Sequence, residues 1–389
     1  MNKAAGRLPF GFPPDLAVLT LSNFIWGLGE GLFIYFYPLS LQYWALDTVQ
    51  IGLVLSMIGV IMAVVQVPAG YLSDRFGTRP LIRAAFVLGV ASALTMGFAE
   101  NHIVFVTGML GMGFTSFVGA PLYSYATQMR GNFSVQRVVT LVSGFYMLGT
   151  IVGPAVGGWI GQTAGLPTVF RTSAGLFFLA TVVIFFARRP ATQDVLESAV
   201  PMVSPLANPR FLGLLVVIFL TIFALSMPQQ LTSIYLQEVH DLSLQQIGTT
   251  GTLAGIGAAV IMFALGNLSA PAGMIVGQLL IGLFSLIMWR GQSAAAFYTG
   301  YLFVGGYRLY RSMALAFARQ LVKASDIGLA YGLVETGSAL AITLAPLAAG
   351  FLYNSKPVSV YTVSIAALAF TIAVHALLSQ KMRPEAARL

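Results

Sequence analysis

The sequence predicts an all-α integral membrane protein whose twelve transmembrane helices form two pseudo-symmetric bundles of six helices. Composition, hydrophobic length and an internal repeat predict this fold. Hydrophobic residues make up 57% of the 389 residues and charged residues only 8%, whereas soluble domains carry about 25% charged residues. A helix that crosses a bilayer needs about 20 mostly apolar residues, and the apolar runs provide twelve such segments. These runs do not alternate apolar and polar residues as membrane β-strands do.

The apolar runs and the polar breaks between them place the helices. The first run is too long for the hydrophobic part of a signal peptide, so we expect it to stay as the first span. The longest polar break divides the chain into an N-terminal bundle at 1–187, a cytoplasmic linker at 188–210 and a C-terminal bundle at 211–389. The expected helices are 15–38, 49–72, 80–99, 103–127, 137–160, 168–187, 211–236, 245–268, 271–289, 295–319, 327–352 and 359–380.

The two halves of the chain repeat one another. The segments Gln50-Ile51-Gly52 and Gly70-Tyr71-Leu72-Ser73 recur 196 residues later as Gln246-Ile247-Gly248 and Gly266-Asn267-Leu268-Ser269. A second repeat relates Pro154 and Gly158 to Pro346 and Gly350. Duplication of a six-helix unit is typical of transporters whose two halves rock around a central cavity.

The net charge of +8 reflects topology rather than nucleic-acid binding. Only Arg171, Arg290 and Lys356 fall on the predicted outer side, so both termini are expected in the cytoplasm of a multi-pass cell-membrane protein. Fifteen of the 20 basic residues fall on the predicted inner side: Lys3, Arg7, Arg75, Arg79, Arg83, Arg130, Arg137, Arg188, Arg189, Arg210, Arg319, Lys323, Lys381, Arg383 and Arg388.

Several kinds of chemistry are absent from the sequence. The chain has no cysteine, which excludes disulfides and thiolate metal sites. It has no phosphate-binding G-x-x-x-x-G-K-S/T segment, so ATP-driven transport by this chain alone is not expected. No catalytic triad, metal cluster or cofactor motif indicates a membrane enzyme. We therefore expect no enzymatic activity, no cofactor and no metal.

A dense cluster of charge lies between the second and third predicted helices. Its residues Gly70, Asp74, Arg75, Gly77 and Arg79 form a tight turn with charges that stay in water or pair with a helix end. The stretch resembles the G-x-L-x-D-R-x-G-R-K signature of the major facilitator superfamily, except that Thr78 stands where a basic residue is usual.

The repeated copy of this turn suggests what its charges do. In the copy, Ala270 stands in place of Asp74 and Pro271 in place of Arg75. A turn alone therefore does not need the charges. We expect Asp74 to meet the positive end of the eleventh helix when the cytoplasmic side is closed, as a gate.

The helix at 137–160 carries a run of small residues around a proline: Gly149, Gly153, Pro154, Gly157 and Gly158. Small residues at four-residue spacing let another helix approach closely, and each glycine alone is explained by packing. Together they resemble G-x-x-x-G-P-x-x-G-G, the antiporter motif of the drug/proton antiporter branch of the superfamily. That resemblance implies a twelve-helix antiporter that exports its substrate.

Glu30 is the ionisable residue inside the first predicted helix, near the middle of the bilayer. A carboxylate at that depth is costly unless it is protonated, paired or facing water. We favour Glu30 as the proton-coupling residue, and the alternative is a structural carboxyl group bonded to neighbouring helices. The residues Asn23, Trp26, Phe33 and Tyr37 share its face and are expected to contact an apolar or amphipathic substrate.

Arg308 and Arg311 lie inside the tenth predicted helix, beside Tyr307. Arginine does not escape burial by deprotonating, so each needs an anion, a carboxylate or water. Glu335 enters the eleventh helix at a depth that suits an ion pair with Arg311. Arg308 is then left for Glu30 or for an anionic group of a substrate. The resemblance implies that helices 1, 4, 7 and 10 line the cavity, which adds these polar candidates: Ser226, Gln229 and Gln230.

The sequence thus predicts a monomeric secondary active transporter in the lipid bilayer, which exports a small amphipathic or drug-like molecule in exchange for protons by alternating access. One alternative is a transporter of an anionic solute or lipid bound by Arg308 and Arg311. Another, of a different class, is a membrane receptor or scaffold without turnover.

Overall fold

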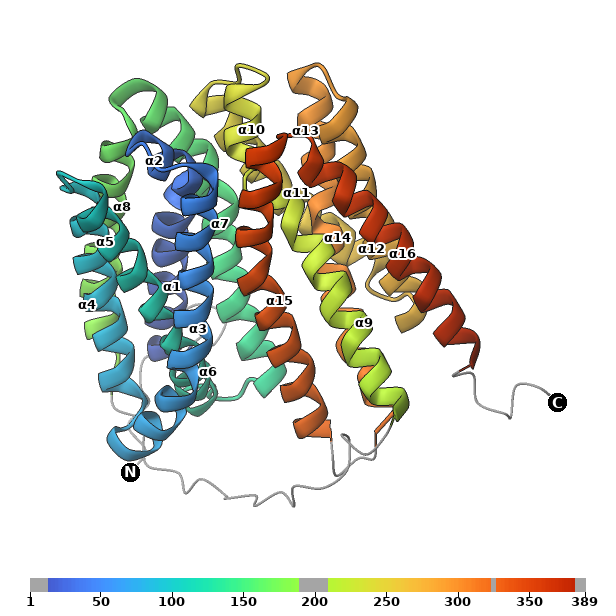
Figure 1. Cartoon of the computed structure of the whole chain (residues 1–389). Coiled ribbons are helices and arrows are strands. Elements are labelled where there is room, and N and C mark those ends of the chain that lie inside the picture. Colours follow the sequence, from blue (N-terminus) through green and yellow to red (C-terminus); the bar gives the residue numbers. More distant parts are fainter. Residues whose placement is uncertain (1–12, 189–208, 323–326, 382–389) are drawn as a thin grey trace. The chain divides into compact units, whose positions relative to one another are not determined.

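The computed structural model describes residues 13–188, 209–322 and 327–381, and all regular structure within these residues is helical (Figure 1). Ten described segments are long and apolar enough to cross a membrane. The predicted spans at 295–319 and 359–380 are also helical; the second is apolar over Ser359–His375. Most of the predicted linker at 188–210 lies outside the described residues.

Eight of the predicted spans are single helices within a few residues of their expected bounds. Hydrophobic length therefore placed them well. They are α3 (Thr48–Phe76), α4 (Thr78–Gly97), α7 (Val135–Ala164), α8 (Leu166–Phe185), α11 (Leu244–Leu265), α12 (Ala270–Arg290), α15 (Ile327–Ser355) and α16 (Ser359–Lys381).

Every third span is instead broken by one turn of 3₁₀-helix, a feature that often marks a hinge. The first span is α1 (Pro14–Phe33), η2 (Ile34–Phe36) and α2 (Tyr37–Tyr43). The fourth is α5 (His102–Phe114), η3 (Thr115–Val118) and α6 (Gly119–Gln128). The seventh is α9 (Pro209–Ser226), η5 (Met227–Gln229) and α10 (Thr232–Glu238). The tenth is α13 (Ala294–Leu302), η6 (Phe303–Gly305) and α14 (Gly306–Gln320).

The described chain divides into two compact units. Unit 1 comprises residues 13–44, 60–188 and 243–252, and unit 2 comprises 45–59, 209–242, 253–322 and 327–381. The first turns of α11 thus pack with the N-terminal helices, and those of α3 pack with the C-terminal helices. This exchange is the same in both copies of the repeat.

Within unit 1, α1 packs against α7 and α8, and α4 packs against α5 and α8. Within unit 2, α9 packs against α15 and α16, and α12 packs against α14 and α16. Taken as whole spans, these are equivalent contacts under the repeat, although α4 packs mainly on the first half of the fourth span and α12 on the second half of the tenth. The structure thus supports the pseudo-symmetry that the sequence predicts.

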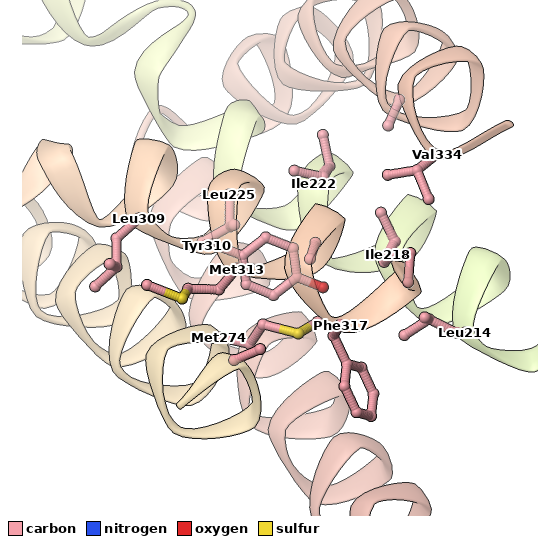
Figure 2. Packing of buried hydrophobic residues seen from close by; sticks show 14 of the residues in the cluster. Leu214, Ile218, Ile222, Leu225, Met274, Leu309, Tyr310, Met313, Phe317 and Val334 are labelled. Carbon is pink, nitrogen blue, oxygen red and sulfur yellow. The ribbon is translucent and has the colours of Figure 1, made fainter. Parts of the chain in front are cut away.

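The core of unit 2 gathers side chains from α9, α12, α14 and α15 (Figure 2). Ile222, Met274 and Tyr310 are completely buried in it. The helix α14 contributes one buried face only, because Arg308, Ser312 and Arg319 on its other face are exposed. This polar face explains why the tenth span is less apolar than the others.

Candidate functional site

Glu30 lies on α1 and accepts a hydrogen bond from another helix of unit 1. The Tyr146 hydroxyl group of α7 donates to Glu30 Oε2 at 3.0 Å. The Trp26 side chain, on the preceding turn of α1, lies close to Glu30. The residue as a whole is half-buried. Its carboxyl group is therefore positioned by α7.

The aromatic residues on the Glu30 face do not all share one environment. Trp26 is 7% exposed and stacks on Phe177 at a ring-centroid distance of 4.3 Å. Phe33 is completely buried and lies 5.5 Å from the ring of Phe170. Both rings thus pack inside unit 1 against α8 and hold α1 in place.

The other two residues predicted on this face are polar. Asn23 is 7% exposed. Tyr37 is half-buried, and its hydroxyl oxygen is buried with no hydrogen-bond partner among the described residues. The hydroxyl oxygen of Tyr37 thus faces the protein interior, and its role as a substrate contact stays a prediction.

The glycines of the α7 motif bring this helix against two others. A Cβ atom at Gly149, Gly153 or Gly157 would overlap the backbone of α1. At Gly158, on another side of α7, a Cβ would lie 2.5 Å from the Leu244 carbonyl oxygen of α11. The glycines are thus required for packing on both sides. Pro154 lies between these contacts, in the helix interior, where it removes a backbone donor.

The predicted ion pair between Arg311 and Glu335 is present in unit 2, and each side chain is 40% exposed. Tyr307 of α14 lies close to Arg311 and to Ser226 of α9. Arg308 is exposed on the same helix. Whether Arg308 serves Glu30 or a substrate stays a prediction, since Glu30 and Arg308 belong to different units.

The polar residues around η5 satisfy their hydrogen bonds locally. The Ser226 hydroxyl group donates to the Ile222 carbonyl oxygen at 2.7 Å. Gln229 donates to Leu225 O at 2.8 Å, and Gln230 donates to Ser226 O at 3.1 Å. Both glutamines are half-buried, and their role as substrate contacts stays a prediction.

The charged turn joins α3 to α4 at Gly77, whose φ of 84° suits glycine and few other residues. Its N–H group donates to the Ser73 carbonyl oxygen at 2.8 Å. The Arg75 side chain is exposed and Arg79 is half-buried. Gly70 and the Asp74 side chain lie outside the part that the structure describes in detail, so the gate at Asp74 stays a prediction.

Two polar residues of unit 1 were missed from the sequence. Tyr146 precedes Gly149 by three residues and therefore lies on the glycine face of α7 that meets α1. That spacing could have identified it as a partner of Glu30. Thr252 of α11 contacts the α7 backbone next to Pro154. Among the described residues no group of three His, Asp or Glu side chains could hold a metal ion.

Comparisons with known proteins agree with this geometry. The family model described as "Major Facilitator Superfamily" matches residues 19–306. The chain is similar to the "Multi-drug resistance efflux pump PmrA" of Streptococcus pneumoniae, with 26% identity over 68% of this chain and 66% of that protein, slightly less than two thirds of its length. It is also similar to the "Multidrug resistance protein MdtG" of a Rahnella species, with 26% identity over 72% of each chain.

A solved structure shows the same fold. A mutant of the nucleoside transporter NupG matches with a TM-score of 0.78 over 95% of this chain and 100% of that chain, at 11% identity. The helical architecture and the family match lead to one conclusion. The chain belongs to the Major Facilitator Superfamily and is a membrane transporter rather than an enzyme.

Proposed function

We propose that this transporter exports small amphipathic compounds in exchange for protons and that Glu30 carries the proton. The observation that supports this most is the Glu30 carboxyl group inside the first span, which accepts a hydrogen bond from Tyr146 of another helix. A carboxyl group inside a span is costly and is normally retained for a function. The multidrug efflux proteins among the relatives favour export and an amphipathic cargo.

The proposed cycle uses the two states of this carboxyl group. When Glu30 is charged, it needs its donor Tyr146, whereas the protonated form needs this donor less. Glu30 then takes up a proton from the outer side and releases it to the inner side. Protonation of Glu30 alternates with binding of the substrate. We further propose that the protein works as a monomer by alternating access and that both of its termini lie in the cytoplasm.

The test is transport into proteoliposomes with an imposed pH gradient, with ethidium as the amphipathic probe. We expect the unaltered protein to accumulate ethidium on the acidic side. Glu30→Gln should abolish accumulation driven by the gradient. Glu100→Gln, at an exposed position after α4, is the matched control and should transport normally. Undiminished coupling in Glu30→Gln would refute the role of Glu30.

A second candidate is the export of amphipathic anions, which a specific feature of unit 2 favours. A cleft of about 640 Å³ lies between α14 and α15, with Arg319, Ser312 and Tyr331 in its wall and Leu315 as an apolar contact. This combination suits an organic anion. Accumulation of carboxyfluorescein in the same assay, lost in Arg319→Gln, would favour this candidate over a cationic cargo.

A further inference from the structure

The hydroxyl group of Thr252 enters the backbone hydrogen-bond ladder of α7. It accepts from the Ala155 N–H group at 3.1 Å and donates to the Ile151 carbonyl oxygen at 2.7 Å. In a regular α-helix the N–H of residue 155 pairs with the C=O of residue 151. The hydroxyl group thus bonds to both members of one such pair. A side chain that bonds to the helical ladder next to a proline is a known cause of local bending.

The first turns of α11 reach α7 along a line of close contacts that ends at Thr252. Near the start of α11, the Leu244 N–H group donates to Gln162 Oε1 at 3.1 Å. One turn further, a Cβ at Gly158 would lie 3.0 Å from the Gly248 Cα atom. Thr252 is the last residue of α11 that belongs to unit 1. We call this contact, from Leu244 to Thr252, the α7–α11 dock.

The equivalent dock in unit 2 lacks the inserted hydroxyl bond. There, α3 packs on α15 through Gly52, and Ser56 occupies the position 196 residues before Thr252. The Ser56 hydroxyl group is buried and has no hydrogen-bond partner among the described residues. Close helix packing alone therefore does not produce the insertion. It is specific to α7, the helix that carries Tyr146.

The helix α7 connects the dock to Glu30. Tyr146 donates to Glu30, and Ile151 lies five residues further along the helix, roughly 7.5 Å along its axis. Gly149 and Gly153 hold the intervening segment against α1. Tyr146 and the backbone that Thr252 engages thus lie on one packed segment of α7.

We propose that Thr252 is a positioning residue that couples the protonation of Glu30 to the α7–α11 dock. While Glu30 is charged, Tyr146 is bound firmly and α7 keeps the form that bonds to the Thr252 hydroxyl group. When Glu30 is protonated, the bond between Tyr146 and Glu30 weakens, the Thr252 hydroxyl group releases Ala155 and Ile151, and the first turns of α11 leave α7. This inference rests on the proposed proton coupling through Glu30.

The test measures docking directly, without transport. The chain has no cysteine, so spin labels attach only at Thr163→Cys on α7 and Gln245→Cys on α11, both exposed positions. Double electron–electron resonance between the labels reports the docked and undocked populations. Thr252→Val keeps the side-chain shape but removes the hydroxyl group. We expect it to lower the docked-to-undocked ratio roughly 3- to 10-fold, the scale of a lost hydrogen bond.

Two further variants control for shape and for folding. Thr252→Ser keeps the hydroxyl group and should restore the docked population. Thr249→Val, on the same helix, removes a hydroxyl group that bonds only to its own helix at Gln245 O, and it should leave the populations unchanged. An unchanged ratio in Thr252→Val, or a loss in Thr249→Val as large as in Thr252→Val, would overturn the proposal.

The coupling itself is tested with Glu30→Gln in the labelled protein. This variant should lower the docked population when Thr252 is present and should add no effect in Thr252→Val. If Glu30→Gln abolishes proton-driven transport but leaves docking unchanged, the coupling role of Thr252 is refuted while the proposed function stands. If Glu30→Gln transports with full coupling, the proposed function fails whatever the labels report.

Discussion

Replacing Gly157 by alanine tests the packing of α7 on α1. A Cβ atom at Gly157 would lie 2.7 Å from the Leu32 carbonyl carbon and 2.9 Å from the Leu32 Cα atom. These are backbone atoms, so no change of side-chain rotamer relieves the overlap, and the two helices must separate. Gly144 lies on the same helix, and a Cβ there would meet nothing within 4 Å. Gly144→Ala is therefore the matched control.

The two substitutions should change stability in opposite directions. Alanine is favoured over glycine in a helix interior by about 0.5–1 kcal/mol, so Gly144→Ala should stabilise the protein by that amount. Gly157→Ala gains the same term but also overpacks a close contact, which costs about 1–3 kcal/mol or more. The free energies of unfolding of the two variants should thus differ by about 1–3 kcal/mol.

Thermal unfolding in detergent, followed by tryptophan fluorescence, measures this difference. The expected order of midpoints is Gly144→Ala above the unaltered protein and Gly157→Ala below it. Equal midpoints for the two variants would show that Gly157 does not lie against the α1 backbone, and the packing explanation of the motif would be wrong. A stable Gly157→Ala that fails to transport would also contradict it, because the glycine would then matter for movement rather than for packing.

Two further predictions concern charge. Glu335→Gln removes one partner of the ion pair with Arg311; both side chains are 40% exposed, so we expect a loss of about 1 kcal/mol or less. A double-mutant cycle with Arg311→Gln, measured by thermal unfolding, checks this, and strictly additive effects would contradict the pairing. Burial lowers the pKa of His240, in the loop after α10, from its ordinary value of 6.5. The folded protein thus keeps His240 neutral, and the stability that this provides is present above pH 6.5 and lost as the pH falls through the lowered pKa. His240→Phe should therefore show a smaller fall in midpoint between pH 7.5 and pH 5 than the unaltered protein, and equal falls would refute the role of His240.

The sequence predicted the features that follow from hydrophobic length and depth. The helix bounds depend on the number of apolar residues that a bilayer needs, so α11 begins at Leu244, one residue from its expected start. The pair of Arg311 and Glu335 follows from equal depth on neighbouring helices. Both inferences use one coordinate, the position along the membrane normal, and an isolated sequence supplies that coordinate.

The rotation of each helix about its axis is harder to predict, and the unpredicted contacts depend on it. The face that holds Trp26, Glu30 and Phe33 could be found from helical spacing. Which neighbouring helix each part of that face meets depends on packing between distant segments. Trp26 and Phe33 therefore proved to be buried against α8. Tyr146 was missed as a partner of Glu30, because its spacing to Gly149 indicates the partner only once α7 is known to pack on α1.

The repeat separates residues that only pack helices together from residues that carry polar chemistry. Gly248 packs on Pro154 in unit 1 as Gly52 packs on Pro346 in unit 2. These glycines therefore form the same helix contact in both copies and explain no difference between the copies. The chemistry lies where the copies differ. Glu30 has no acidic counterpart at 209–237, the Asp74 position holds an alanine in the second copy, and the hydroxyl group of Thr252 is bonded where that of Ser56 is not. In all three cases the residue with the additional charge or hydrogen bond lies in the N-terminal copy or among the residues of α11 that belong to unit 1. Under the proposed proton coupling, these residues are the asymmetric bond network that would make the movement of a symmetric scaffold depend on a proton.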